Sequence, residues 1–214
     1  MNNLLLAIAW EGIEMINVYI MLAAVLLAVV LVLVFKNKNE TFNTKAIVYG
    51  AMCIALAAVL NTFTVFSMPN GGSVTICRVL PLLIYAYAFG AKRGFIVGAI
   101  YGLIDFIAKP WFVHPIQFLL DYIFAFSMVG FAGIFNKKPS MRTFAFILGT
   151  VIFGFARFGC SVISGVLYWE TPLWGSITYN SVLLVDAAVS LIGVIVLQKS
   201  KSFNAVIDNT RAQA

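Results

Sequence analysis

Charged residues are scarce in this sequence. Asp, Glu, Lys and Arg make up 10% of its 214 residues, against 62% hydrophobic residues and a mean hydropathy of +1.00. A water-soluble domain needs far more polar surface to cover its core. The composition therefore excludes a soluble fold and predicts a membrane protein embedded in the lipid bilayer. The net charge of +6 does not indicate nucleic-acid binding, because most basic residues lie in short segments between apolar runs.

Signatures of catalysis and metal binding are also lacking. The sequence has no G-x-x-x-x-G-K-[ST] phosphate loop, so this chain cannot hydrolyse ATP by that route. His114 is the only histidine, and Cys53, Cys77 and Cys160 have no spacing typical of a metal site or redox pair. We therefore expect no enzymatic activity, no metal and no cofactor, and we interpret the cysteines as small packing residues.

Long apolar runs are what the sequence does have. A transmembrane helix needs roughly 20 mostly apolar residues. Seven segments meet or approach this length: 15–35, 46–66, 76–89, 94–108, 116–135, 143–168 and 176–198. The third and fourth are short, so we expect them inside the bundle or little tilted. We interpret the first as an anchor and not a cleaved signal, because it lacks a basic start and basic residues follow it.

Lysine and arginine predict how these spans are oriented. Cytoplasmic loops of membrane proteins carry an excess of basic residues. With seven alternating spans, eleven basic residues fall on one side and three on the other side or within the spans. The sequence therefore predicts a multi-pass protein of the cell membrane with an outside N-terminus and a cytoplasmic C-terminus. Three outer loops, at 67–75, 109–115 and 169–175, carry Pro, Gly and Trp.

Four ionisable residues lie within the predicted spans, where charge is costly and often functional. Asp121 shares a helix face with Gln117, four residues earlier, and is a candidate ligand contact or a partner of Arg157. Arg157 begins a polar stripe that continues through Ser161, Ser164 and Tyr168. We expect Arg157 to pair with Asp186 or Asp121, and direct ligand contact is the alternative. We interpret Asp105 as a solvated helix end.

Aromatic residues gather near the outer ends of the spans. They form either an interfacial belt or a cage for a flat cationic ring. We favour the cage for Trp169 and the belt for Trp174. Ala51 and Ala55 have small-xxx-small spacing, which serves internal packing or docking of another membrane subunit.

Several motifs together resemble a known family. They are MPNGGSVT at 68–75, VHPIQFLLDY at 113–122 and GFAGIF at 130–135, followed by Ser164-Gly165-Val166, Trp169 and Tyr179-Asn180. This combination resembles the thiamine-specific substrate-binding (S) components of energy-coupling factor transporters, over roughly residues 46–198. The resemblance implies six helices around an outward-facing site for thiamine. It also implies delivery through a complex of a transmembrane coupling protein and two ATPase subunits.

The resemblance assigns roles to particular residues. It implies ligand binding by the following residues: Asp121, Tyr122, Trp169, Asn180, Trp111 and Tyr101. From the resemblance together with their positions in the sequence, we also predict ligand binding by Ser161, Arg157 and Gln117. The resemblance also implies a lid loop formed by Asn70, Gly71, Gly72 and Ser73, and partner docking at Ala51 and Ala55. The chain departs from the family where Asp121 replaces a usual Glu, and where Arg157, Ser161 and Gly175 replace Lys, His and Tyr. The span at 15–35 is additional.

The sequence thus predicts an all-α, polytopic membrane helical bundle with a six-helix S-component core and one extra N-terminal helix. We expect three parts: an extra transmembrane helix and basic loop at 1–45, a binding domain at 46–198 and a cytoplasmic tail at 199–214. The predicted function is high-affinity thiamine binding for uptake. The alternatives are an S component for another small vitamin or a thiamine precursor, and a self-sufficient secondary transporter.

Overall fold

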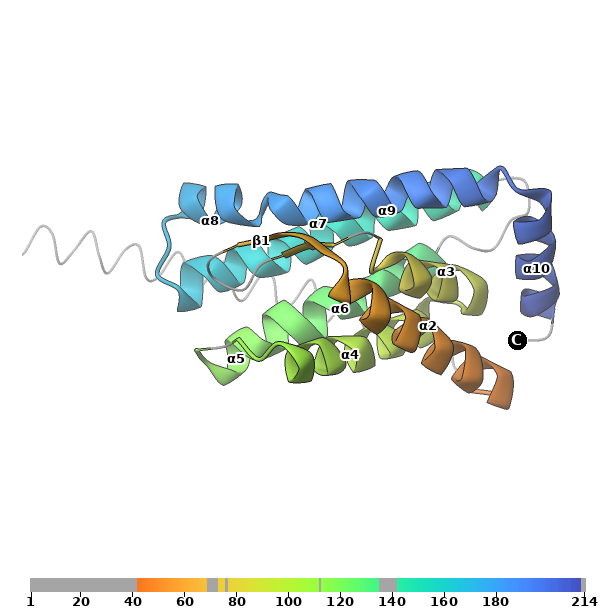
Figure 1. Cartoon of the computed structure of the whole chain (residues 1–214), viewed down its shortest axis with the longest axis horizontal. Coiled ribbons are helices and arrows are strands. Elements are labelled where there is room, and N and C mark those ends of the chain that lie inside the picture. The colour runs from red at the N-terminus through yellow and green to blue at the C-terminus, as the bar shows by residue number, and fades with distance from the viewer. Residues whose placement is uncertain (1–41, 69–72, 76, 112, 135–141, 213–214) are drawn as a thin grey trace, which may run out of the picture. The chain divides into compact units, whose positions relative to one another are not determined.

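The computed structural model describes residues 42–68, 73–75, 77–111, 113–134 and 142–212. These residues belong to one compact unit that spans residues 41–214. The span expected at 15–35 lies outside the described residues. The described part consists of helices and one small β-hairpin, which confirms the prediction of an all-α bundle (Figure 1).

The first described helix, α2 (Thr44–Thr62), packs against the bundle through small residues. Asn43 caps its start, because the side-chain oxygen accepts a hydrogen bond from the Ala46 amide at 2.8 Å. The buried positions recur at helical spacing and form one narrow face: Ala46, Gly50, Ala57 and Asn61. Small side chains allow the backbone of α2 to approach its neighbours α3 and α4 closely.

Two short strands follow α2, and the first of them begins within the apolar run that predicted helix up to residue 66. β1 (Thr64–Ser67) pairs in antiparallel fashion with β2 (Ser73–Thr75), and Thr64 lies opposite Thr75. The expectation of helix at 64–66 was therefore wrong. Thr, Val and Phe in β1 favour extended backbone, and pairing with β2 decides between the two conformations.

Helices α3 (Leu80–Phe89) and α4 (Ala91–Ala108) are joined by Gly90, whose φ of 96° suits glycine. Eight of the ten residues of α3 are buried, which confirms the expectation that this short helix lies inside the bundle. Two glycines of α4 bring it against the next segment. A Cβ on Gly98 would lie 2.3 Å from the Phe126 carbonyl oxygen, and one on Gly102 would lie 2.2 Å from that of Tyr122.

The segment from Pro115 to Gly133 changes helix type along its length. It begins as α5 (Pro115–Phe118), widens into the π-helix η1 (Leu119–Phe124), and continues through α6 (Ala125–Ser127) into the 3₁₀-helix η2 (Met128–Gly133). Single turns of π-helix occur frequently at functional sites. Here the π turn carries Asp121 and Tyr122.

The last helices complete the bundle. α7 (Arg142–Tyr168) and α9 (Val182–Gln198) lie along each other, and α8 (Leu173–Asn180) precedes α9 in the same helical run (Figure 1). Residues 199–214 were expected only as a tail, but α10 (Lys201–Ala212) forms there and contacts α3 and α9. Four of the described helical segments are long and apolar enough to cross a membrane.

Candidate ligand-binding site

A cavity of about 320 Å³ lies among α4, the segment around Asp121, α7 and α8. This volume is at the lower end of the range of about 300–1,000 Å³ found for small-molecule sites. Its walls combine aromatic rings with charged and amide side chains from segments far apart in the sequence. The cavity therefore suits one small ligand that has both flat and polar parts.

Asp121 is a carboxylate of the cavity wall that is held by neutral donors. Gln117 Nε2 and Ser164 Oγ both donate hydrogen bonds to its Oδ2. The backbone amide of Val113 donates to Gln117 Oε1 at 3.2 Å, which fixes the side-chain amide with its nitrogen toward Asp121. None of the ion pairs within the described residues includes Asp121. Its charge can therefore attract a cationic ligand.

Two tryptophans face each other at the cavity. The rings of Trp111 and Trp169 lie with centroids 6.2 Å apart and planes only 4° from parallel. The Tyr122 hydroxyl is 3.2 Å from the backbone carbonyl oxygens of both Lys109 and Trp111, so it holds the loop that carries Trp111. A pair of parallel aromatic faces can bind a flat ring, most strongly a cationic one.

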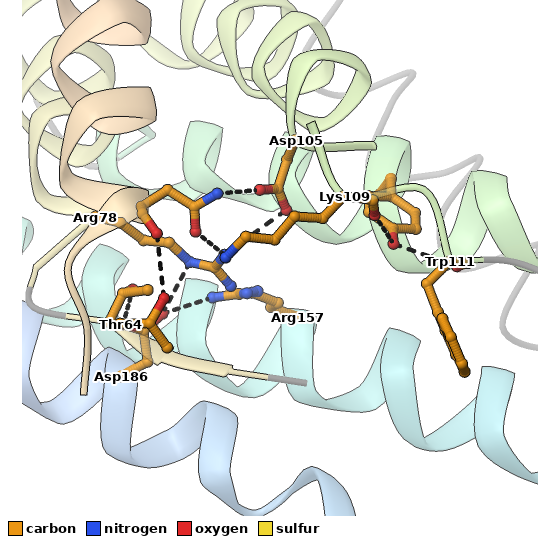
Figure 2. A network of polar contacts seen from close by, with 10 residues as sticks. Thr64, Arg78, Asp105, Lys109, Trp111, Arg157 and Asp186 are labelled. Carbon is orange, nitrogen blue, oxygen red and sulfur yellow. Dashed lines mark hydrogen bonds and ion pairs between the residues drawn. The ribbon is translucent and has the colours of Figure 1, made fainter. Parts of the chain in front are cut away.

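A buried ion cluster borders the cavity, formed by Arg78, Asp105, Arg157 and Asp186 (Figure 2). Arg157 Nη1 donates to Asp186 Oδ2 at 3.0 Å, so of the two partners expected for Arg157, Asp186 and Asp121, the structure shows Asp186. Arg78 lies between the two carboxylates, 3.7 Å from each. The guanidinium groups of both arginines also lie over the ring of Phe126, at 5.3 Å and 4.6 Å from its centroid. The cluster is neutral overall, since two cations meet two anions.

Two polar side chains extend this cluster toward α2 and the hairpin. Asn61 Nδ2 donates to Asp105 Oδ1 at 2.7 Å, and Asn61 Oδ1 accepts from Arg78 Nη1 at 2.9 Å. Thr75 Oγ1 donates to Asp186 Oδ1 at 3.2 Å. Asp105 is only 8% exposed, so its interpretation as a solvated helix end was wrong. The Arg78 guanidinium and the Asn61 amide take the place of the water that would surround a carboxylate at a solvated helix end.

The opposite wall is built where α7 meets α8. Asn180 Nδ2 donates to the backbone oxygens of Ser161 and Ser176, at 3.2 Å and 3.0 Å, and so joins the two helices. Gly165 permits this approach, because a Cβ there would lie 2.3 Å from Ser176 Oγ. The Asn180 oxygen accepts no hydrogen bond from the residues that the structure describes, so a ligand can donate to it.

The comparisons with known proteins agree with this architecture. The family model described as "Thiamine transporter protein" matches residues 47–205. The chain belongs to the thiamine transporter protein family. The thiamine transporter ThiT of Bacillus subtilis (strain 168) is 29% identical over 170 residues, covering 71% of this chain and 88% of that protein. A solved structure of ThiT from Listeria monocytogenes aligns with a TM-score of 0.63 and 24% identity, covering 73% of this chain and 94% of that chain.

Membership of the thiamine transporter family makes this chain a multi-pass membrane protein that serves transport, in agreement with the expectation that it is not an enzyme. The structural likeness to the Listeria protein concerns the fold. Among the residues that the structure describes, no group of three or more His, Cys, Asp or Glu side chains is placed to hold a metal ion.

Most of the residues predicted to bind the ligand line one cavity of this protein. Those that line it are Asp121, Tyr122, Trp169, Asn180, Trp111, Ser161, Arg157 and Gln117. Tyr101 does not line it: the residue is fully buried and packs edge-on against Phe126, with ring centroids 4.9 Å apart. Of the predicted lid loop, Ser73 lines the cavity, and Asn70, Gly71 and Gly72 lie outside the described residues.

Several cavity residues were not predicted as ligand contacts, among them Arg78, Asp105, Lys109, Phe126 and Tyr179. Arg78 had a signal in the sequence, because it is a lone arginine beside an apolar run on the side with few basic residues. Asp105 had one as an ionisable residue within a predicted span, and Tyr179 as part of the Tyr179-Asn180 motif. Lys109 and Phe126 carried no local pattern that distinguishes a cavity wall from a helix end. His114 lies at the start of α5, where its Nδ1 accepts a hydrogen bond from the Ile116 amide.

Proposed function

We propose that this chain is a membrane-embedded binding subunit that captures thiamine and presents it for uptake. The observation that carries the proposal is a carboxylate outside any described ion pair, Asp121, in a small cavity that also has two parallel tryptophan rings. Thiamine combines a flat aminopyrimidine with a cationic thiazolium ring. A carboxylate that has no ion-pair partner of its own, together with aromatic faces, can recognise such a molecule.

The tryptophan geometry supports stacking of a ligand ring on Trp169. A flat ring inserted between two others needs them about 7 Å apart, since each contact distance is about 3.5 Å. The rings of Trp111 and Trp169 are closer than this, at 6.2 Å between centroids. Trp111 is 46% exposed, so we propose that its side chain moves outward to let the ligand ring enter between them and then closes over it.

The remaining predicted contacts complete this proposal. Asn180 and Ser161 offer an amide and a hydroxyl on the α7–α8 wall, while Tyr122 and Gln117 hold Trp111 and Asp121 in place. We propose that Arg157 contributes through its pair with Asp186. We propose that Tyr101 acts from behind the cavity, by supporting Phe126. Ser73, at the start of β2, belongs to the proposed lid loop with Asn70, Gly71 and Gly72.

Delivery across the membrane is proposed to need partners, namely a transmembrane coupling protein and two ATPase subunits. The lack of a phosphate loop in this chain supports a separate source of ATP hydrolysis. Ala51 and Ala55 support docking through α2, because both are exposed and therefore not used for packing within the described bundle. We propose the C-terminus as cytoplasmic and the N-terminus as outside, on the distribution of Lys and Arg.

The test is a titration of the purified protein with thiamine, followed by quenching of tryptophan fluorescence. We expect saturable quenching, and Trp169→Ala to weaken binding several-fold to about 30-fold, from the lost cation–π contact of roughly 0.5–2 kcal/mol. Trp174→Phe is the matched control, because Trp174 is 78% exposed and does not line the cavity. Equal affinity of wild type and Trp169→Ala would refute the proposed site.

The alternatives differ in measurable ways. Competition of bound thiamine with other vitamins, and with the pyrimidine half of thiamine, tests the identity of the ligand. If one of these compounds binds more tightly than thiamine, that compound is the ligand and thiamine is not. Uptake into vesicles that contain this chain alone tests the partners. Accumulation without any ATPase subunit would favour a secondary transporter.

A further inference from the structure

Asn61 connects α2 to the ligand cavity without lining it. It lies in the last turn of α2 and is 5% exposed. Its side chain bonds Arg78 and Asp105, which both line the cavity. Within the described residues, α2 contributes no side chain to the cavity wall. Asn61 is therefore the polar link through which a change at the cavity reaches this helix.

Arg78 is held by the charge of two carboxylates but has a hydrogen-bond donor left for a ligand. Both of its carboxylate neighbours lie 3.7 Å away, which is beyond hydrogen-bond distance. Its Nε has no hydrogen-bond partner among the described residues, and the Nη1 bond to Asn61 is its one side-chain hydrogen bond there. A buried guanidinium with unused donors gains from an acceptor in the cavity. Because Nε and Nη1 belong to one rigid planar group, turning Nε toward that acceptor moves Nη1 and weakens its bond to Asn61.

Asn61 is the buried polar side chain of α2, and it attaches this end of the helix to Arg78 and Asp105. The other buried positions of α2 are Ala or Gly, which bury little apolar area. A second polar attachment lies at the opposite end, where the Tyr85 hydroxyl donates to the Ala46 carbonyl at 3.0 Å. Loss of the Arg78 bond therefore loosens the end of α2 near Asn61, while the Ala46 end stays fixed.

We propose that Asn61 is a positioning residue that couples occupancy of the cavity to α2. A ligand acceptor takes the hydrogen bond of Arg78, and Asn61 keeps only its bond to Asp105. The last turn of α2, the helix that carries Ala51 and Ala55, then becomes more mobile. Because such coupling is reciprocal, a partner that fixes α2 also changes the affinity for the ligand. This inference rests on the proposed function.

Hydrogen exchange of the α2 amides, measured by mass spectrometry with and without thiamine, tests the coupling. In the wild type we expect thiamine to speed exchange in the last turn of α2 about tenfold, as expected for losing one charged hydrogen bond. In Asn61→Leu we expect fast exchange with and without thiamine. Thr62→Val is the control, because Thr62 is exposed and its hydroxyl bonds its own helix, so it should respond as the wild type does.

A second variant and a second readout separate the outcomes. Asn61→Ala removes the bonds to Arg78 and Asp105 with a smaller side chain than Leu, so its exchange should be fast with and without thiamine even if Asn61→Leu does not fold. Quenching of tryptophan fluorescence reports binding in the same samples. Binding without any change in α2 exchange, or the wild-type change in either Asn61 variant, would overturn the coupling alone. Absence of quenching in the wild type would instead count against the proposed function.

Discussion

Replacing Asp186 by Asn tests whether the buried ion cluster stabilises the fold. Asp186 is fully buried, and its Oδ2 lies 3.0 Å from Arg157 Nη1 and 3.7 Å from Arg78 Nε. The substitution keeps the shape of the side chain and removes its charge. Two buried guanidinium groups are then left with the single carboxylate of Asp105.

The expected cost follows from the geometry of the cluster. Removing one partner of a buried ion pair costs about 3–5 kcal/mol, because an uncompensated charge remains. The ring of Phe126 lies under both arginines in the wild type already, so its cation–π contacts contribute to both proteins and leave this cost unchanged. We therefore expect the free energy of unfolding to fall by about 3–5 kcal/mol in Asp186→Asn.

Unfolding of the detergent-solubilised protein, followed by circular dichroism, measures this change. Asp186→Asn combined with Arg157→Met should recover part of the loss, because the double variant removes the unpaired charge together with its partner. Ser190→Ala is a control on the same helix, since among the described residues its buried hydroxyl bonds only the carbonyl of Asp186 in its own helix. A loss under about 0.5 kcal/mol in Asp186→Asn would refute the stabilising role.

Two further predictions concern the cavity walls. Tyr122→Phe removes the hydroxyl that holds the Trp111 loop, so thiamine should dissociate roughly three- to tenfold faster in stopped-flow fluorescence, as expected for about 0.5–1.5 kcal/mol; an unchanged rate would contradict the holding role. Gly165→Ala places a Cβ 2.3 Å from Ser176 Oγ, so we expect about 1–3 kcal/mol of destabilisation and weaker thiamine binding. Unaltered melting and affinity would show that α7 and α8 can separate at no cost.

Local spacing in the sequence predicted the parts of the site that lie on one helix. Gln117 and Asp121 are four residues apart, and their side chains do bond each other. The polar stripe of the predicted span at 143–168 likewise placed Arg157 on a face that turns inward, where it meets Asp186. Such patterns depend on helix geometry alone, so they hold however the helices are arranged in the bundle.

Contacts between distant segments could not be predicted in this way. Asp105 was misread because its partners, Asn61 and Arg78, come from other elements and only the folded bundle brings them together. The strand at 64–67 was missed because its apolar residues continue the hydrophobic run of α2, and the pairing with β2 decides its conformation. The position of Tyr101 behind Phe126 depends on packing of α4 against α6.

The most direct test of the account measures how much the positive charge of the ligand contributes to binding. Thiamine and a neutral analogue, in which carbon replaces the quaternary nitrogen, are titrated by calorimetry against the wild type and Asp121→Asn. If the carboxylate of Asp121 recognises the cation, the wild type should prefer thiamine by about 30-fold or more, and the variant should lose most of that preference. Equal preference for thiamine in both proteins would contradict the account.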